Sequence, residues 1–272
     1  MDSYAEHKIS DRLSNGFKIS VSTIFSKSSE IFKGIWGYAI LALIVYYILS
    51  GVINYFLGLI FPSASLDYDE IIQGLQAGDS DYVIEILSEY GENADSSSSI
   101  ISSIISFALY PILFSIYTMA YKFDHYKNVE FSDLFVHYKD GKFVRIVLAS
   151  VIFYLVSIVG FVLCIVPGIV VYVMWMLAIP LIVFADANLG EALKYSMNLA
   201  FKDFGSFFVF FLAIIGVIIV GILLCCVGLI GAVPFTFVLT YVLYKEVVGF
   251  PNENAEIEEI GTDIYKDNPY MN

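Results

Sequence analysis

Long apolar stretches separated by short polar segments make up most of this chain. Runs without a charged residue cover 34–60, 100–121, 146–184 and 204–244. A bilayer core of ~30 Å needs roughly 20 helical residues, so the first two runs are one crossing each. The other two runs hold 39 and 41 residues, and each is about 60 Å long as a helix. Since each must cross twice, the pattern predicts an all-α polytopic membrane protein with six transmembrane helices.

The connections between these spans differ in length. Pro167 and Gly168 are predicted to turn the chain between the third and fourth spans, and residues 228–231 between the fifth and sixth. The connection 61–95 is longer and has apolar residues at one-face helical spacing, first from Tyr68 to Leu75 and then from Val83 to Tyr90. It therefore predicts two short helices.

Apolar stripes at helical spacing precede the three odd-numbered spans. They lie within 17–32, 131–138 and 189–204, and a polar break follows each of them, at Lys33-Gly34, Lys139-Asp140-Gly141 and Lys202-Asp203-Phe204-Gly205. Each stripe is typical of an amphipathic helix in the membrane interface. Asn188 and Glu191 have capping-box spacing at the start of the third stripe. We interpret the chain as three repeats, each an interfacial amphipathic helix followed by a transmembrane hairpin; chance similarity among apolar segments is the alternative.

The basic residues all fall on one side of the predicted spans. The connections on the other side carry none of the 14 Lys and Arg residues. Basic residues near membrane spans are retained on the cytoplasmic face. The three amphipathic helices and both termini are therefore expected in the cytoplasm, and the connection 61–95 becomes an outer loop. The basic residues are Lys8, Arg12, Lys18, Lys27, Lys33, Lys122, Lys127, Lys139, Lys142, Arg145, Lys194, Lys202, Lys245 and Lys266.

Composition agrees with a membrane location. Apolar residues make up 58% of the chain, and the mean hydropathy is +0.78. The first 33 residues are polar or amphipathic and contain no signal-peptide pattern. We divide the chain into a segment 1–33 with an amphipathic helix, a six-helix membrane domain 34–249 with the outer helical loop 61–95, and an acidic tail 250–272 that we expect to be disordered. The net charge of −13 makes nucleic acid an unsuitable partner.

Residues that could carry chemistry are few. Cys164, Cys225 and Cys226 show no metal-ligand spacing and predict either small apolar packing or a redox-sensitive thiol cluster. The three histidines lie in the predicted cytoplasmic segments without a zinc pattern: His7, His125 and His137. We therefore predict no catalytic, cofactor-binding or metal-binding residue and no enzyme activity.

Two further features allow more than one interpretation. Arg145 and Asp186, at the inner ends of spans three and four, either pair with each other or remain a snorkelling Arg and a solvated Asp. The acidic side chains of the outer loop follow no calcium-loop spacing and predict a solvated face. Pro111, Pro180 and Pro234 lie inside spans, where proline ordinarily produces a kink.

The hairpin of spans three and four and the segment after it carry a recognisable pattern. The residues are Leu163 to Ile169, Ala178 to Val183, Glu191 to Ser196, and Lys202 to Phe204. Residues 100–250 resemble the membrane domain found ahead of some bacterial glycerophosphodiester phosphodiesterases and its stand-alone relatives of unknown function. The resemblance implies an all-helical fold in the bacterial cytoplasmic (inner) membrane. This chain differs in having only a short acidic tail after the last span, and no basic residue between Val170 and Pro180.

Two classes of function remain for such a chain. The first, which we prefer from the sequence, is a non-enzymatic scaffold or accessory subunit, which would contact membrane lipids and bind a protein partner at the outer loop. The second is a carrier or permeation protein for an apolar or lipid-like solute, since a cavity lined by Tyr, Phe and Ser needs no charge. A groove between the repeats would favour the carrier, and tightly packed repeats would favour the scaffold.

Overall fold

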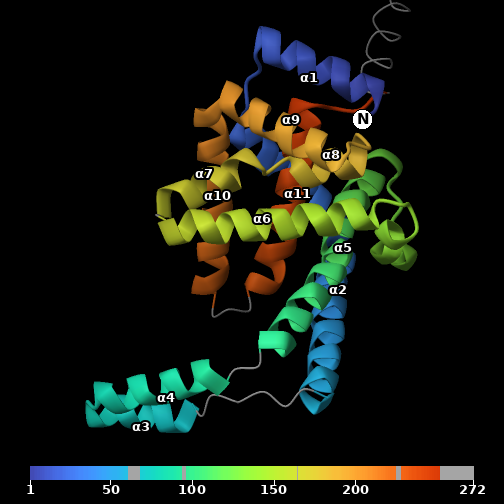
Figure 1. Cartoon of the computed structure of the whole chain (residues 1–272). Helices are drawn as coiled ribbons and strands as arrows, with labels where there is room; N and C mark the ends of the chain where they lie inside the picture. Colours follow the sequence, from blue (N-terminus) through green and yellow to red (C-terminus); the bar gives the residue numbers. More distant parts are fainter. Residues whose placement is uncertain (61–67, 94–95, 164, 225–227, 252–272) are drawn as a thin grey trace, which may run out of the picture. The chain divides into compact units, whose positions relative to one another are not determined.

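The structure, a computed structural model, describes residues 1–60, 68–93, 96–163, 165–224 and 228–251. Within these ranges the chain is helical and contains no strand (Figure 1). Six of the described helical segments are long and apolar enough to cross a membrane. The six predicted spans are thereby confirmed, and the chain is a multi-pass membrane protein. The segments are Val21–Ile60, Ser103–Tyr126, Phe143–Gly160, Val166–Phe184, Phe204–Leu223 and Leu229–Val247.

The chain forms two compact units. The smaller unit is Val45–Leu109, and the larger unit joins Met1–Ile44 to Tyr110–Asn272. Helices α2 (Val21–Ile60) and α5 (Ser96–Tyr126) contribute to both. The other helices of the larger unit are α1 (Ser3–Asn15), the 3-10 helix η1 (Phe131–Tyr138), α6 (Phe143–Leu163), α7 (Ile165–Met174), α8 (Ala178–Phe184), α9 (Leu189–Lys202), α10 (Phe204–Leu223) and α11 (Leu229–Val247).

The smaller unit contains the two short helices predicted for the connection 61–95. Helices α3 (Tyr68–Ala77) and α4 (Ser80–Asn93) lie side by side (Figure 1). Gly78 joins them with φ 72°, and a Cβ on Gly74 would lie 2.7 Å from a methyl carbon of Val83. The two helices therefore approach closely at a position that needs glycine.

Helix α2 differs from the prediction at its start. It runs without interruption for 40 residues, so the predicted break at Lys33-Gly34 is wrong. A single glycine weakens a helix by only about 1 kcal/mol, and polar side chains on one face do not end it. The first apolar stripe and the first span therefore belong to one helix of about 60 Å.

The turn between α6 and α7 also differs from the prediction. Pro167 and Gly168 were expected to form it, but both lie in the first turn of α7. Proline is tolerated there because the first N–H groups of a helix have no partner within it. Gly168 serves packing instead: a Cβ on Gly160 of α6 would lie 2.9 Å from the Cα atom of Gly168. Of the residues 228–231 that were predicted to turn the chain between α10 and α11, Gly228 caps the start of α11, whereas 229–231 lie within that helix.

The other two predicted polar breaks are present. Gly141, with φ 75°, separates η1 from α6, and Asp203 separates α9 from α10 and accepts a hydrogen bond from the N–H of Ser206. The stripe 131–138 forms a 3-10 helix and not the expected α-helix. Helix α9 begins as predicted, with a capping box between Asn188 and Glu191.

Helix α1 was not predicted as a separate element. It packs against α9 (Figure 1), with Ile9 fully buried. The backbone N–H of Asp2 donates to the carbonyl of Ala185 over 2.7 Å, and Arg12 Nε donates to the carbonyl of Val247 over 3.1 Å. The start of the chain thus connects α1 to the loop after α8 and to the end of α11.

Candidate functional site

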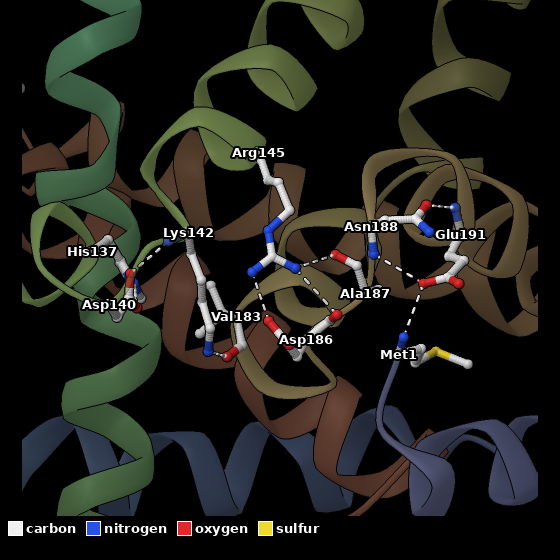
Figure 2. Close-up of polar contacts among 10 residues, drawn as sticks. All are labelled: Met1, His137, Asp140, Lys142, Arg145, Val183, Asp186, Ala187, Asn188 and Glu191. Atoms are coloured by element: carbon white, nitrogen blue, oxygen red, sulfur yellow. Dashed lines mark hydrogen bonds and ion pairs between the residues drawn. The ribbon is translucent and has the colours of Figure 1, made fainter.

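Lys and Arg residues lie at one end of the spans, and these ends meet in a polar layer of the larger unit. Figure 2 shows part of this layer. Arg145, in the first turn of α6, reaches the loop that follows α8. Its Nη2 atom lies 2.6 Å from the Asp186 carboxylate, and its Nη1 atom donates to the carbonyls of Asp186 and Ala187. Of the two alternatives that the sequence left open, the structure thus shows the pairing of Arg145 with Asp186. Arg145 holds the pKa of Asp186 below its ordinary value.

The same loop leads into the capped start of α9. Asn188 accepts a hydrogen bond from the N–H of Glu191, and Glu191 accepts one from the N–H of Asn188, each over 2.9 Å. The amino group of Met1 lies 3.1 Å from the Glu191 carboxylate (Figure 2). The hydrogen bond from Asn188 and the charge of the amino group lower the pKa of Glu191.

A buried histidine lies on the other side of Arg145 in this layer. His137 Nδ1 is 2.8 Å from Asp140 Oδ2, and its Nε2 is 3.4 Å from the hydroxyl of Thr118. Burial lowers the pKa of His137, and the neighbouring Asp140 carboxylate opposes this effect. Lys142 follows and donates to the carbonyl of Val183 at the end of α8 (Figure 2).

Further ion pairs join helices that are distant in sequence. Asp124 of α5 accepts hydrogen bonds from the Tyr241 hydroxyl and from Lys245 of α11, each over 2.8 Å. Lys27 of α2 pairs with Glu246 over 2.6 Å. Each of these charges bonds to another helix of the fold, so we assign the polar layer a structural role.

The structure shows no cluster of metal-binding side chains in the part of the chain that it describes. No group of three or more His, Cys, Asp or Glu residues could hold a metal ion in these segments. His7 lies exposed on α1, whereas the His125 ring on α5 packs against Tyr121. The three cysteines, Cys164, Cys225 and Cys226, lie outside the described residues.

A cavity of about 310 Å³ lies among the spans of the larger unit. Its wall contains side chains from α5, α6, α7, α8, α9, α10 and α11 and the segment between α7 and α8, and none of them is charged. The volume is at the lower end of the range for small-molecule sites, which are mostly apolar with a few polar groups. This cavity is the candidate functional site.

Aromatic rings form two walls of the cavity. Phe114 and Tyr117 of α5 are stacked at 5.9 Å with an interplanar angle of 5°, and the Phe237 ring of α11 meets the Phe114 ring edge-on at 5.8 Å. In a second group, the Phe153 ring of α6 lies 5.4 Å from the Tyr172 ring of α7. Rings fixed in such pairs give the cavity flat apolar faces.

The fourth span is interrupted where it borders the cavity. Helix α7 ends at Met174 and α8 begins at Ala178, with a turn at Trp175, Met176 and Leu177 between them. Pro180 explains the interruption, because its ring has no N–H and clashes with the carbonyl four residues earlier, that of Met176. Both Trp175 and Met176 line the cavity. The sequence suggested only a kink at Pro180, and the structure shows a break that begins before it.

Ser196 of α9 holds this break. Its fully buried hydroxyl donates to the carbonyl of Met174 over 2.8 Å and accepts from the N–H of Leu177 over 3.1 Å. One side chain therefore pairs a carbonyl on the α7 side of the break and an N–H on the α8 side. Breaks in membrane helices persist where neighbouring side chains pair the freed backbone groups in this way.

Hydroxyl groups supply the polar part of the cavity wall. Ser150 donates to the carbonyl of Ile146 and Thr240 to the carbonyl of Thr236, so both donors bond within their own helices. Ser157 of α6 differs: its buried Oγ has no hydrogen-bond partner among the residues that the structure describes. Such a group is costly to bury unless a bound molecule pairs with it.

One side of the cavity reaches the surface between α6 and α7. Tyr154 and Tyr172 both line the cavity and remain 47% and 37% exposed. The exposed neighbours on the same helices are apolar and include Leu155, Ile158 and Val166. An apolar molecule could therefore reach the cavity across a surface that suits hydrocarbon.

The sequence did not indicate these residues as a site. Their signal is the placement of Tyr, Ser and Thr within otherwise aliphatic spans, for example Ser150, Tyr154 and Ser157 along one helix. A scan against protein-family models finds no match, and neither do searches of curated proteins and of solved structures.

Proposed function

We propose that this protein binds an uncharged, lipid-like molecule in the cavity and acts as a carrier or permeation protein for it. The observation behind this proposal is a charge-free cavity beside a broken span. Discontinuous membrane helices are a recurrent part of solute sites in transporters. From the sequence alone a scaffold was the preferred hypothesis, and it expected tightly packed repeats. The cavity among the spans favours the carrier instead.

The wall of the cavity restricts the ligand to neutral molecules. A charged head group removed from water is costly unless it is paired. The charged side chains of the polar layer bond to one another or to backbone carbonyls, as Arg145 does with Asp186. We therefore infer that the protein is not an enzyme and that its ligand carries no ionic head.

Bound lipid provides the direct test. The protein is purified in mild detergent, and its extracted lipids are quantified by mass spectrometry. A neutral lipid should accompany the native protein and be depleted in Ala149→Phe, which places a ring in the cavity wall. Val209→Phe adds the same ring on the exposed face of α10 and should retain the lipid. Equal neutral lipid in all three proteins would contradict the proposal.

We further propose the bacterial cytoplasmic membrane as the location, with both termini in the cytoplasm. The one-sided distribution of basic residues supports this orientation. So does the polar layer, where Lys27 of α2 bonds to α11, Lys245 of α11 bonds to α5, and Arg145 of α6 bonds to the loop after α8. In a background without native cysteines, a cysteine at Ser80 should react with an impermeant maleimide from outside the cell, and one at Asn128 only after the membrane is opened. External labelling at Asn128 would overturn this orientation.

Three repeats of apolar stripe and hairpin, and kinship with the membrane domain of glycerophosphodiester phosphodiesterases, remain part of the proposal, although in the first repeat the stripe and the span form one helix. The close packing of α6 on α7 and of α10 on α11 supports two of the three hairpins. The capping box and the amphipathic pattern of α9 support one interfacial helix.

A scaffold function remains the second candidate, because the α3–α4 pair is more than a connection between spans requires. It exposes Ile72, Leu75 and Ile84 beside acidic side chains such as Asp81 and Glu85. Apolar residues with an acidic surround are typical of a surface for a protein partner. Replacing residues 65–94 by a flexible linker should then abolish any co-purifying protein while leaving membrane insertion unchanged. An unchanged set of co-purifying proteins would exclude this second function.

A further inference from the structure

The dimensions and walls of the cavity allow the ligand to be described more closely, given the proposed function. A volume of about 310 Å³ equals roughly ten groups of the size of water, at ~30 Å³ each. That space accommodates one ring with its substituents and excludes two acyl chains. Any longer tail must leave the cavity on the side of Tyr154 and Tyr172, where the exposed surface is apolar.

The walls favour a flat ring over a flexible chain. Phe114 and Phe237 form one aromatic wall, and Phe153 and Tyr172 form the other, with Trp175 6.3 Å from Phe153. Aromatic faces bind rings in offset or edge-on arrangements that an acyl chain cannot reproduce. A rigid ring also loses less conformational freedom on binding than a chain of equal size.

Ser157 offers the ligand a hydrogen-bonding group in the cavity wall. Ser157 Oγ is buried and has no partner in the described part of the chain, whereas Ser150, two turns earlier on the same helix, already donates to the carbonyl of Ile146. A ligand with a carbonyl or hydroxyl oxygen on its ring would pair with Ser157 after rotation of that side chain.

We propose that the ligand is a neutral lipid whose head is one flat ring system bearing carbonyl or hydroxyl oxygens, as in a quinone or a phenol. The ring packs against the aromatic walls, and its oxygen bonds to Ser157. The tail extends past Tyr154 into the bilayer.

Fluorescence of Trp175 gives a direct assay, because this residue lines the cavity. The other tryptophan, Trp36, lies exposed on α2. The Trp36→Phe protein in mild detergent is titrated with the ring compound menadione, a small naphthoquinone that quenches tryptophan. Quenching of Trp175 should saturate, while the Trp175→Phe protein, which reports on Trp36, should show only a linear, unsaturable decrease.

Competition tests the preference for a ring. Dodecanol has the same number of non-hydrogen atoms as menadione and one hydroxyl, but no ring. Menadione can make two contacts with aromatic rings that dodecanol cannot, and two such contacts are worth about tenfold in affinity. Dodecanol should therefore displace menadione with an affinity at least tenfold weaker than that of menadione itself. Equal displacement would overturn the ring head and leave a neutral-lipid site intact. Unsaturable quenching of Trp175, with neutral lipid still bound to the purified protein, would also refute the ring head alone.

Substitution of the two serines tests the polar contact. Ser157→Ala should weaken menadione binding roughly five- to tenfold, as expected for one hydrogen bond of ~1 kcal/mol. Ser115→Ala is the control, because the Ser115 hydroxyl is also buried and bonds within its own helix but does not line the cavity, and it should change the affinity less than twofold. Equal loss in both variants, or no loss in Ser157→Ala, would refute the assigned contact.

Discussion

Ser196 is the residue whose removal should most clearly affect the broken span. Its hydroxyl pairs the carbonyl of Met174 and the N–H of Leu177, and the side chain is fully buried. Ser196→Ala leaves two buried backbone groups without these partners, at a cost of about 1–3 kcal/mol each. We expect a loss of roughly 2–6 kcal/mol, which lowers the thermal unfolding midpoint by at least about 4 °C.

The assay measures thermal unfolding by circular dichroism, in one mild detergent, for the native protein, for Ser196→Ala and for the control Ser115→Ala. Ser115 is also fully buried, but its hydroxyl donates to the carbonyl of Ile112 within its own helix, and that carbonyl can keep its helical partner. Ser115→Ala should therefore lower the midpoint by less than 2 °C, a difference of about 1 kcal/mol or less. Equal midpoints for the two variants would refute the bridging role of Ser196.

Two other predictions concern packing and protonation. Gly160→Ala places a Cβ 2.9 Å from the Cα of Gly168 and should destabilise the protein by about 1–3 kcal/mol, whereas Gly216→Ala, with no neighbouring atom within 4 Å, should not; equal unfolding midpoints would argue against close packing of α6 on α7. Burial lowers the pKa of His137 below 6.5, so the unfolded chain binds a proton that the folded chain does not, and stability should fall as the pH drops below about 6.5. His137→Gln should remove that part of the pH dependence of the midpoint, and an unchanged pH profile would contradict the assignment.

The arrangement of charge and apolar length was enough to predict the spans. Helices in a bilayer satisfy their own backbone hydrogen bonds, so an apolar run of sufficient length has few alternatives. The capping box at Asn188 was predictable for a similar reason, because it depends on two residues three positions apart. Features fixed by local chemistry and by the solvent were therefore accessible from the sequence.

The helix ends that were predicted wrongly depend on neighbours instead. Lys33-Gly34 has the composition of a break, yet α2 continues through it. Pro167-Gly168 has the composition of a turn, yet it lies in the first turn of α7, where Gly168 allows close approach to Gly160. Glycine and proline each permit several structures, and the packing around them decides which one forms.

The cavity was not predictable because seven helices contribute to it. Pro180 was visible in the sequence as a potential kink, but its effect depends on Ser196, which supplies bonds to the backbone on both sides of the break. Ser157 was equally visible but unremarkable. It matters only because its hydroxyl lacks a partner where aromatic rings form the surrounding walls.

Helix α9 connects the polar layer to the cavity, and this connection bears on how a bound molecule would be released. Its first turn is fixed by Asn188 and Glu191, Leu193 lines the cavity, and Ser196 pairs the backbone at the break. Helix α1 packs on the same helix through its own buried face. Any displacement of α9 would therefore weaken the bonds at Met174 and Leu177 and alter the cavity wall at the same time. A scaffold has no need for such coupling, whereas a carrier must alternate between a wall that retains its solute and one that releases it.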